Sequence, residues 1–189
     1  MPPRCATSCI FQITDVSFRE SERTVNSSGD QYESALRRAV KLLSSKARTV
    51  TELHELLIER YGFDAAVTAR AIERLKQLGY LNDDQLAANL ASSRLRVRPI
   101  GRRRMRHELR QRKLTEPVVQ TAVRHAYETR DEKELVEEAI QKRIRLKGRP
   151  KTRQELKNLY DHLLRLGFEY ETIRQGLTRI PKLELDESA

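Results

Sequence analysis

The sequence is poor in the residues that build β-sheets or disulfide frameworks. Its 189 residues include no tryptophan, 5% aromatics and only two cysteines, Cys5 and Cys9. The β-branched and aromatic runs that are typical of strands are largely missing. Two neighbouring thiols cannot staple a fold and are too few for a four-ligand zinc site. We therefore expect no β-rich core, no disulfide framework, and no metal or other cofactor.

Long apolar runs are missing as well. No stretch approaches the roughly eighteen consecutive apolar residues that a membrane-spanning helix requires. The opening residues lead into no apolar segment of the kind found in secretory signals. With so few cysteines, the sequence favours a reduced, cytoplasmic protein with no membrane partner.

Catalytic motifs are absent too. His54-Glu55 and His107-Glu108 both begin like the motif of zinc proteases, but Ile58 and Gln111 replace the second histidine. No glycine-rich loop precedes a Lys-Ser/Thr pair, and no nucleophile elbow occurs. The sequence therefore predicts a protein that is not an enzyme.

What is present is helical periodicity, which dominates from residue 32 to residue 180. Capping boxes begin at Thr49 and Thr152, and each has a glutamate three residues later. Gly79 is well placed to end a helix that closes at Leu78. These signals predict an all-α fold.

The helices also repeat with a period of roughly 50 residues. Identical internal spacings recur after Gly62-Phe63, Lys113-Leu114 and Gly167-Phe168. They predict an elongated, curved tandem array of three three-helix repeats. We place the repeats at residues 32–81, 82–130 and 131–180, after a flexible, disordered N-terminal arm (1–31) and before a C-terminal tail (181–189).

Positive charge is concentrated in the middle repeat. Between Arg94 and Lys113 there are ten Lys/Arg and one carboxylate, a net charge of +9, while the whole chain carries +10. Such a local field attracts polyanions, of which nucleic acid is the commonest in a cell. The candidate binding residues are Arg94, Arg96, Arg98, Arg102, Arg103, Arg104, Arg106, Arg110, Arg112 and Lys113.

A helix is expected to start at Arg102, after Gly101, with three arginines in its first turn. Positive charge there opposes the helix dipole. The arrangement becomes favourable if a phosphate docks at the helix start, so we interpret it as an anion site. An acidic protein surface is the alternative partner. The stretch contains no aromatic residue for base stacking, which favours contacts with the backbone over readout of sequence.

Three segments of the chain form a recognisable combination: Gly79-Tyr80-Leu81-Asn82-Asp83-Asp84-Gln85-Leu86-Ala87, Ser93-Arg94, and Gly101-Arg102-Arg103-Arg104-Met105-Arg106-His107-Glu108-Leu109. Together they resemble the RecX family of bacterial recombinase regulators, and the resemblance covers about residues 32–180. Leu86 stands where the family usually has Phe, Asn82 replaces a frequent Asp, and Lys113-Leu114 replaces Gly-Ile.

The resemblance implies a monomeric regulator of the RecA recombinase that acts in DNA repair and the SOS response. Such proteins lie in the groove of the RecA filament on single-stranded DNA. There they limit filament growth, ATP hydrolysis, strand exchange and co-protease activity.

Two other interpretations of the residues stay open. The chain could be a stand-alone nucleic-acid-binding protein without a recombinase partner, or a helical scaffold for an acidic protein. The acidic segment 131–138 is interpreted as a solvated face.

Overall fold

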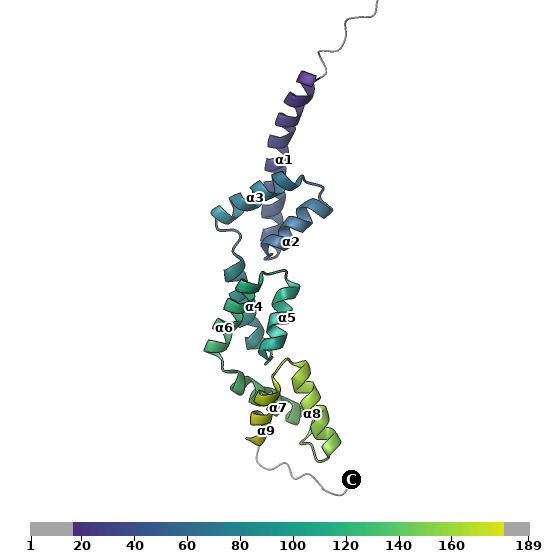
Figure 1. Ribbon diagram of the computed structural model, residues 1–189, viewed down its shortest axis with the longest axis vertical. Helices are drawn as coiled ribbons and strands as arrows, with labels where there is room; N and C mark the ends of the chain where they lie inside the picture. Colours follow the sequence, from purple (N-terminus) through teal and green to yellow (C-terminus); the bar gives the residue numbers. More distant parts are fainter. Residues whose placement is uncertain (1–16, 180–189) are drawn as a thin grey trace, which may run out of the picture.

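The computed structural model describes the backbone of residues 17–179 and the side chains of residues 29–179. Within this part of the chain every regular element is a helix, so the predicted all-α class is confirmed. The helices succeed one another along an elongated molecule, with α1 at one end and α8 and α9 at the other (Figure 1). The expected tail and residues 1–16 lie outside the described residues.

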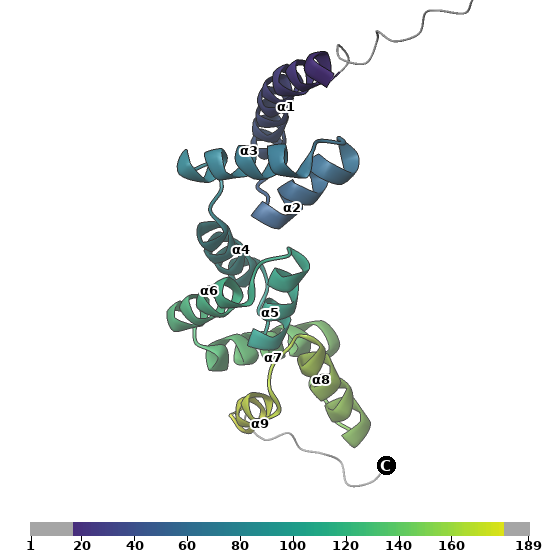
Figure 2. The ribbon, with the colours of Figure 1, turned by 45° about the horizontal axis from the view of Figure 1, so that its top comes forward.

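The first and third helices of each consecutive group of three pack together: α1 with α3, α4 with α6, and α7 with α9. Figure 2 shows the α4–α6 group between the other two. The helix caps Asn82 and Asp131 fall at the proposed repeat boundaries. The helices are α1 (Ser17–Ser45), α2 (Val50–Glu55, continued by a π-helical turn, Leu56–Arg60), α3 (Ala65–Gln77), α4 (Asp83–Val97), α5 (Arg102–Gln111), α6 (Glu116–Thr129), α7 (Glu132–Lys147), α8 (Arg153–Arg165) and α9 (Tyr170–Thr178).

The sequence signals for helix ends are confirmed. Thr49 and Thr152 each form a complete capping box with the glutamate three residues later. Gly79 has a φ of 76°, and the next N–H, of Tyr80, donates to the carbonyl of Leu75 at 2.9 Å. This hydrogen bond ends α3, and glycine is suited to the turn because it adopts positive φ without the steric penalty of other residues.

The N-terminal boundary differs from the prediction. A disordered arm was expected up to residue 31, but α1 begins at Ser17. Gly29 lies inside this helix. An isolated glycine lowers helix stability by about 1 kcal/mol relative to alanine, which does not end a helix whose later turns are packed. From Ala35 onward α1 is anchored by fully buried side chains.

The apolar core is divided unevenly along the array. One continuous cluster joins α4 to α9, and Ile100, Phe168 and Ile173 are fully buried in it. The first three helices have separate clusters, built around Leu53, Leu57 and Ala71. The described core is therefore continuous between the second and third groups and divided between the first and second.

Backbone contact between two glycines joins the second and third groups. The N–H of Gly101 donates to the carbonyl of Leu166 at 2.9 Å. A Cβ built on Gly101 would lie 2.2 Å from the carbonyl oxygen of Gly167, and one built on Gly167 would lie 2.4 Å from the nitrogen of Arg104. Only residues without a side chain allow α5 to approach the α8–α9 turn this closely.

A polar joint connects the first group to the second. The Thr49 hydroxyl donates to the carbonyl of Arg112 at 3.0 Å, and the N–H of Val50 donates to the carboxylate of Asp83 at 3.0 Å. Arg112 also pairs with Glu52, with Nε and Oε1 2.6 Å apart. Capping contacts and an ion pair, rather than a shared core, hold this end of the array.

Replacing Gly101 by alanine is expected to destabilise the protein by roughly 3 kcal/mol, because the clash is with backbone that cannot move aside. Gly29→Ala is the control. A Cβ there meets nothing within 4 Å, so that change should cause no loss. The free energy of unfolding from urea titration measures both, and a loss under 1 kcal/mol for Gly101→Ala would show that the two backbones are not in contact.

Candidate nucleic-acid interface

The start of α5 is already occupied by groups of the protein itself. The N–H of Arg102 donates to the Glu132 carboxylate at 2.9 Å, and the N–H of Arg103 donates to the carbonyl of Gly167 at 3.2 Å. Gly101 is the N-cap, as predicted. The N–H groups of Arg102 and Arg103 therefore have partners within the chain and are not free to bind a phosphate.

Glu132 supplies the anion that the arginine-rich helix start requires. It is only 8% exposed, and its second oxygen accepts from Nε of Arg102 at 3.0 Å. The Arg102 guanidinium also lies 4.8 Å from the ring centre of Tyr127. A carboxylate beside a helix N-terminus offsets the dipole. The acidic segment 131–138 is therefore not wholly a solvated face.

Six of the ten candidate residues form ion pairs within the chain. A cation in such a pair is neutralised by its carboxylate partner, so it offers less charge to a binding partner than the sequence alone indicates. The pairs are Arg94 and Arg104 with Glu108, Arg102 with Glu132, Arg110 with Glu116, Arg112 with Glu52, and Lys113 with Glu55. Lys113 has in addition a φ of 57°, which places a lysine where the equivalent turns have glycine.

Glu108, the one carboxylate of the basic stretch, links two helices. It accepts from Arg94 of α4 at 2.9 Å and from Arg104 of α5 at 3.0 Å. Burial raises its pKa, but the hydrogen bonds and charges of the two arginines outweigh that effect and lower the pKa overall. Arg104 extends the link by donating to the carbonyl of Arg165 at 3.2 Å.

The remaining four candidates, Arg96, Arg98, Arg103 and Arg106, have no carboxylate partner among the residues whose side chains are described. Arg96 donates to the hydroxyl of Ser93 at 3.2 Å. Arg98 and Arg103 are exposed, and Arg106 is half-buried on α5. These four side chains carry the uncompensated charge of the stretch.

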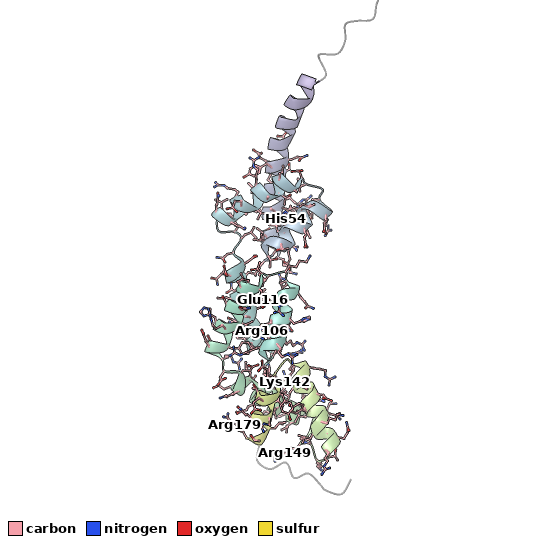
Figure 3. The ribbon with its side chains drawn as sticks, viewed as in Figure 1. His54, Arg106, Glu116, Lys142, Arg149 and Arg179 are labelled. Carbon is pink, nitrogen blue, oxygen red and sulfur yellow. The ribbon has the colours of Figure 1, made fainter. Side chains whose placement is uncertain are left out.

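Two grooves flank α5. A groove of about 770 Å³ separates it from the end of α8, and one of about 590 Å³ separates it from α6. Arg106 and Arg110 line both, so this face of α5 forms a ridge between them. Arg106 lies near the middle of the molecule's length (Figure 3). We call this surface the α5 ridge: Arg103, Arg106, His107 and Arg110 with both grooves.

The structure adds basic residues that sequence reasoning missed. Arg165 contributes to the groove beside α8, and Arg124 to the groove beside α6. A second basic run, residues 142–153, contains seven Lys/Arg and no carboxylate. It was visible in the sequence, but acidic residues elsewhere cancel it in the total charge. A sliding count of charge would have found it.

Among the described residues, no group of three or more His, Cys, Asp or Glu is placed so that it could hold a metal ion. The glutamates of both incomplete protease motifs, Glu55 and Glu108, are taken up by ion pairs. In the same part of the chain, no helix combines the length and apolar character that a membrane crossing requires.

In the part of the chain that the structure describes, the fold and the site define an all-helical protein with a basic ridge on α5. A family model described as "RecX, second three-helix domain" matches residues 82–123, which include the α5 ridge. The chain is 34% identical over 146 residues to regulatory protein RecX of Prosthecochloris aestuarii, covering 77% of this chain and 93% of that protein. For regulatory protein RecX of Chlorobaculum tepidum the identity is 34% over 157 residues, covering 82% and 91%.

The chain therefore belongs to the RecX family, whose matched members are named regulatory proteins. The fold agrees. The crystal structure of RecX from Lactobacillus salivarius superimposes with a TM-score of 0.72 at 18% identity, covering 80% of this chain and 97% of that one. A second crystal structure, of regulatory protein RecX, gives 0.71 at 20% identity, covering 88% and 81%.

The free energy of unfolding should fall in acid, because two carboxylates that link helices, Glu52 and Glu108, have lowered pKa values. Burial raises the pKa of Glu52, but Arg112 and the Thr49 backbone outweigh it, and Glu108 behaves similarly. Their stabilisation is complete above the ordinary glutamate pKa of 4.5 and is lost as pH falls through the lower folded values. Each adds at most about 1.4 kcal/mol per pH unit.

Urea titrations between pH 7 and pH 3 measure this dependence. Glu52→Gln/Glu108→Gln should flatten the acid limb, whereas Glu73→Gln, an exposed residue 4.0 Å from Lys76, should leave it unchanged. An equally steep acid limb in the double variant would contradict the assignment.

Proposed function

We propose that the chain is a non-enzymatic, monomeric, cytoplasmic regulator that binds the RecA–single-stranded DNA filament in its groove and inhibits the recombinase. Membership of the RecX family supports this proposal. The observation that carries it is the α5 ridge, where Arg103 and Arg106 project with no carboxylate partner among the described side chains. Inhibition would extend to ATP hydrolysis, strand exchange and the filament's co-protease activity.

The ridge would bind through charge and shape. Guanidinium groups bind phosphate or carboxylate in a bidentate manner, so the partner is either the DNA backbone or acidic residues of the recombinase. No aromatic side chain lines either groove, so base stacking is not part of the proposed contact. Because α4 to α9 share one core, the ridge is presented by a rigid body, which reduces the entropy lost on binding.

The first group of helices would have a different role, because the polar joint attaches it to the second group. It is attached by Thr49, Arg112 and Glu52 without a shared core. Such a joint adjusts more readily than a packed core, so the first group could follow an adjacent recombinase subunit while the rigid part occupies the groove.

RecA ATPase on saturated single-stranded DNA tests the proposal. Substoichiometric amounts of the protein should inhibit, because a molecule in the groove or at a filament end affects many subunits. Inhibition that appears only when the protein competes for all the DNA would instead favour a stand-alone nucleic-acid-binding protein. That alternative predicts an affinity for bare DNA that falls steeply with salt. The ridge is consistent with it, because binding a phosphate backbone through charge requires no recombinase.

Charge reversal at Arg98, Arg103 and Arg106 should raise the concentration for half-inhibition at least tenfold. None of the three side chains forms an ion pair in the described structure, so the fold should survive. Arg102 is left intact because its reversal would separate it from Glu132. The matched control is Lys41→Glu/Arg74→Glu/Lys76→Glu, which makes the same change of net charge on exposed positions of α1 and α3.

Full inhibition by the Arg98/Arg103/Arg106 variant would contradict the proposal. Equal loss in both variants would point to net charge rather than to the ridge. Circular dichroism and thermal melting confirm that each variant is folded before the comparison is made.

A further inference from the structure

A second strongly basic surface covers the end of α7, the turn that follows and the start of α8. Between Ala139 and Gln154 the sequence has no carboxylate. Six of the seven cations are exposed, and Arg143 is half-buried. We call this the α7–α8 basic surface: Lys142, Arg143, Arg145, Lys147, Arg149, Lys151 and Arg153.

Its side chains differ from those of the α5 stretch because none is paired. Among the described residues, no carboxylate lies within ion-pair distance of any of the seven. The nearest acid in sequence, Glu155, directs one oxygen to the N–H groups of Lys151, at 2.7 Å, and Thr152, at 3.4 Å. That carboxylate serves the capping box of α8 and leaves the cationic side chains free.

Helix stabilisation explains only part of this charge. Arg145 and Lys147 lie in the last turn of α7, where cations favour the dipole. Lys151 and Arg153 lie at the start of α8, where cations oppose it. Local stability therefore does not account for a basic run that continues across the turn.

The surface has a groove of about 310 Å³. Ile144, Pro150 and Leu159 line it together with Arg143, Lys147 and Arg149, and so does Glu155, whose carboxylate caps α8. Lys142 and Arg149 lie further toward the α8–α9 end of the molecule than Arg106 (Figure 3). Exposed cations spread around a partly apolar groove suit an extended polyanion better than a single small anion.

Residues of α8 connect this groove with the α5 ridge. Asn158 lines the α7–α8 groove and Arg165 lines the groove beside α5. Seven residues apart, they share one face of α8 about 10 Å from each other along its axis. His162 lies between them in sequence. Burial lowers its pKa, and the charges of Arg143, Arg165 and Arg98 lower it further.

We propose that the α7–α8 basic surface is a second binding site for the phosphate backbone of single-stranded nucleic acid, contiguous along α8 with the α5 ridge. One strand would cross both. Seven unpaired cations in twelve residues match a chain with a phosphate at every nucleotide better than a protein surface with scattered carboxylates. The inference deepens the proposed function by naming the ligand chemistry, but its test requires no recombinase.

The direct test is binding of a fluorescent oligodeoxythymidylate of about 20 nucleotides at several salt concentrations. Lys147→Gln/Arg149→Gln/Lys151→Gln removes three exposed charges, so the slope of log K against log salt should fall by about 2. At 0.1 M salt the affinity should drop on the order of tenfold to a hundredfold. Lys41→Gln/Arg74→Gln/Lys76→Gln is the matched control and should change little.

Equal affinity and slope in the two triple variants would overturn the proposal. So would a preference of the wild-type protein for a poly-glutamate peptide over the oligonucleotide at the same salt, which would identify an acidic protein as the occupant. Loss of DNA binding in the Lys147→Gln/Arg149→Gln/Lys151→Gln variant with ATPase inhibition retained would support the second site and show that the inhibition of the recombinase does not depend on it.

An NMR titration of the His162 ring tests the continuity of the two sites. Phosphates held between Arg143 and Arg165 offset the arginine charges, so the oligonucleotide should raise the pKa of His162. The NMR signals of the His125 ring, which is exposed on α6, should move less when the oligonucleotide is added. No change at His162 when the oligonucleotide is saturating would show that no strand crosses α8.

Discussion

The close approach of α5 to the α8–α9 turn is the contact on which the rest of the structure depends. Gly101 and Gly167 bring two backbones together, and the N–H groups that start α5 bond to Glu132 and to Gly167 itself. The contact closes the long core that runs from α4 to α9. It also resolves an electrostatic conflict, because a buried carboxylate compensates arginines placed where the helix dipole disfavours them.

Ion pairs within the chain divide the basic residues between Arg94 and Lys113 into two groups. Arg102, Arg104 and Arg112 hold helices together, whereas Arg98, Arg103 and Arg106 are left with uncompensated charge. The total charge of the stretch therefore overstates what a partner would meet. The α7–α8 basic surface carries seven cations that form no ion pair in the described structure, although the chain's net charge conceals them.

Much of the fold could be predicted because its signals are local. Capping boxes at Thr49 and Thr152, the turn at Gly79 and the α5 start at Arg102 all depend on residues within one or two turns. The partners of the arginines could not be predicted, since Arg102 and Glu132 are 30 residues apart and Arg112 and Glu52 are 60 apart. For the same reason the sequence did not identify Glu132 as the carboxylate that bonds to the start of α5. The start of α1 could not be predicted from the residues near Gly29, because the helix is stabilised by the packing of its later turns, from Ala35 onward.

The central claim is that the α5 ridge faces the recombinase filament. A photo-crosslinking amino acid at His107, which lines the groove beside α8, tests it most directly, with Gln77 at the end of α3 as the reference position. With RecA assembled on single-stranded DNA, the account predicts crosslinks from position 107 to DNA or recombinase and far fewer from position 77. Crosslinks from position 77 with none from position 107 would contradict it.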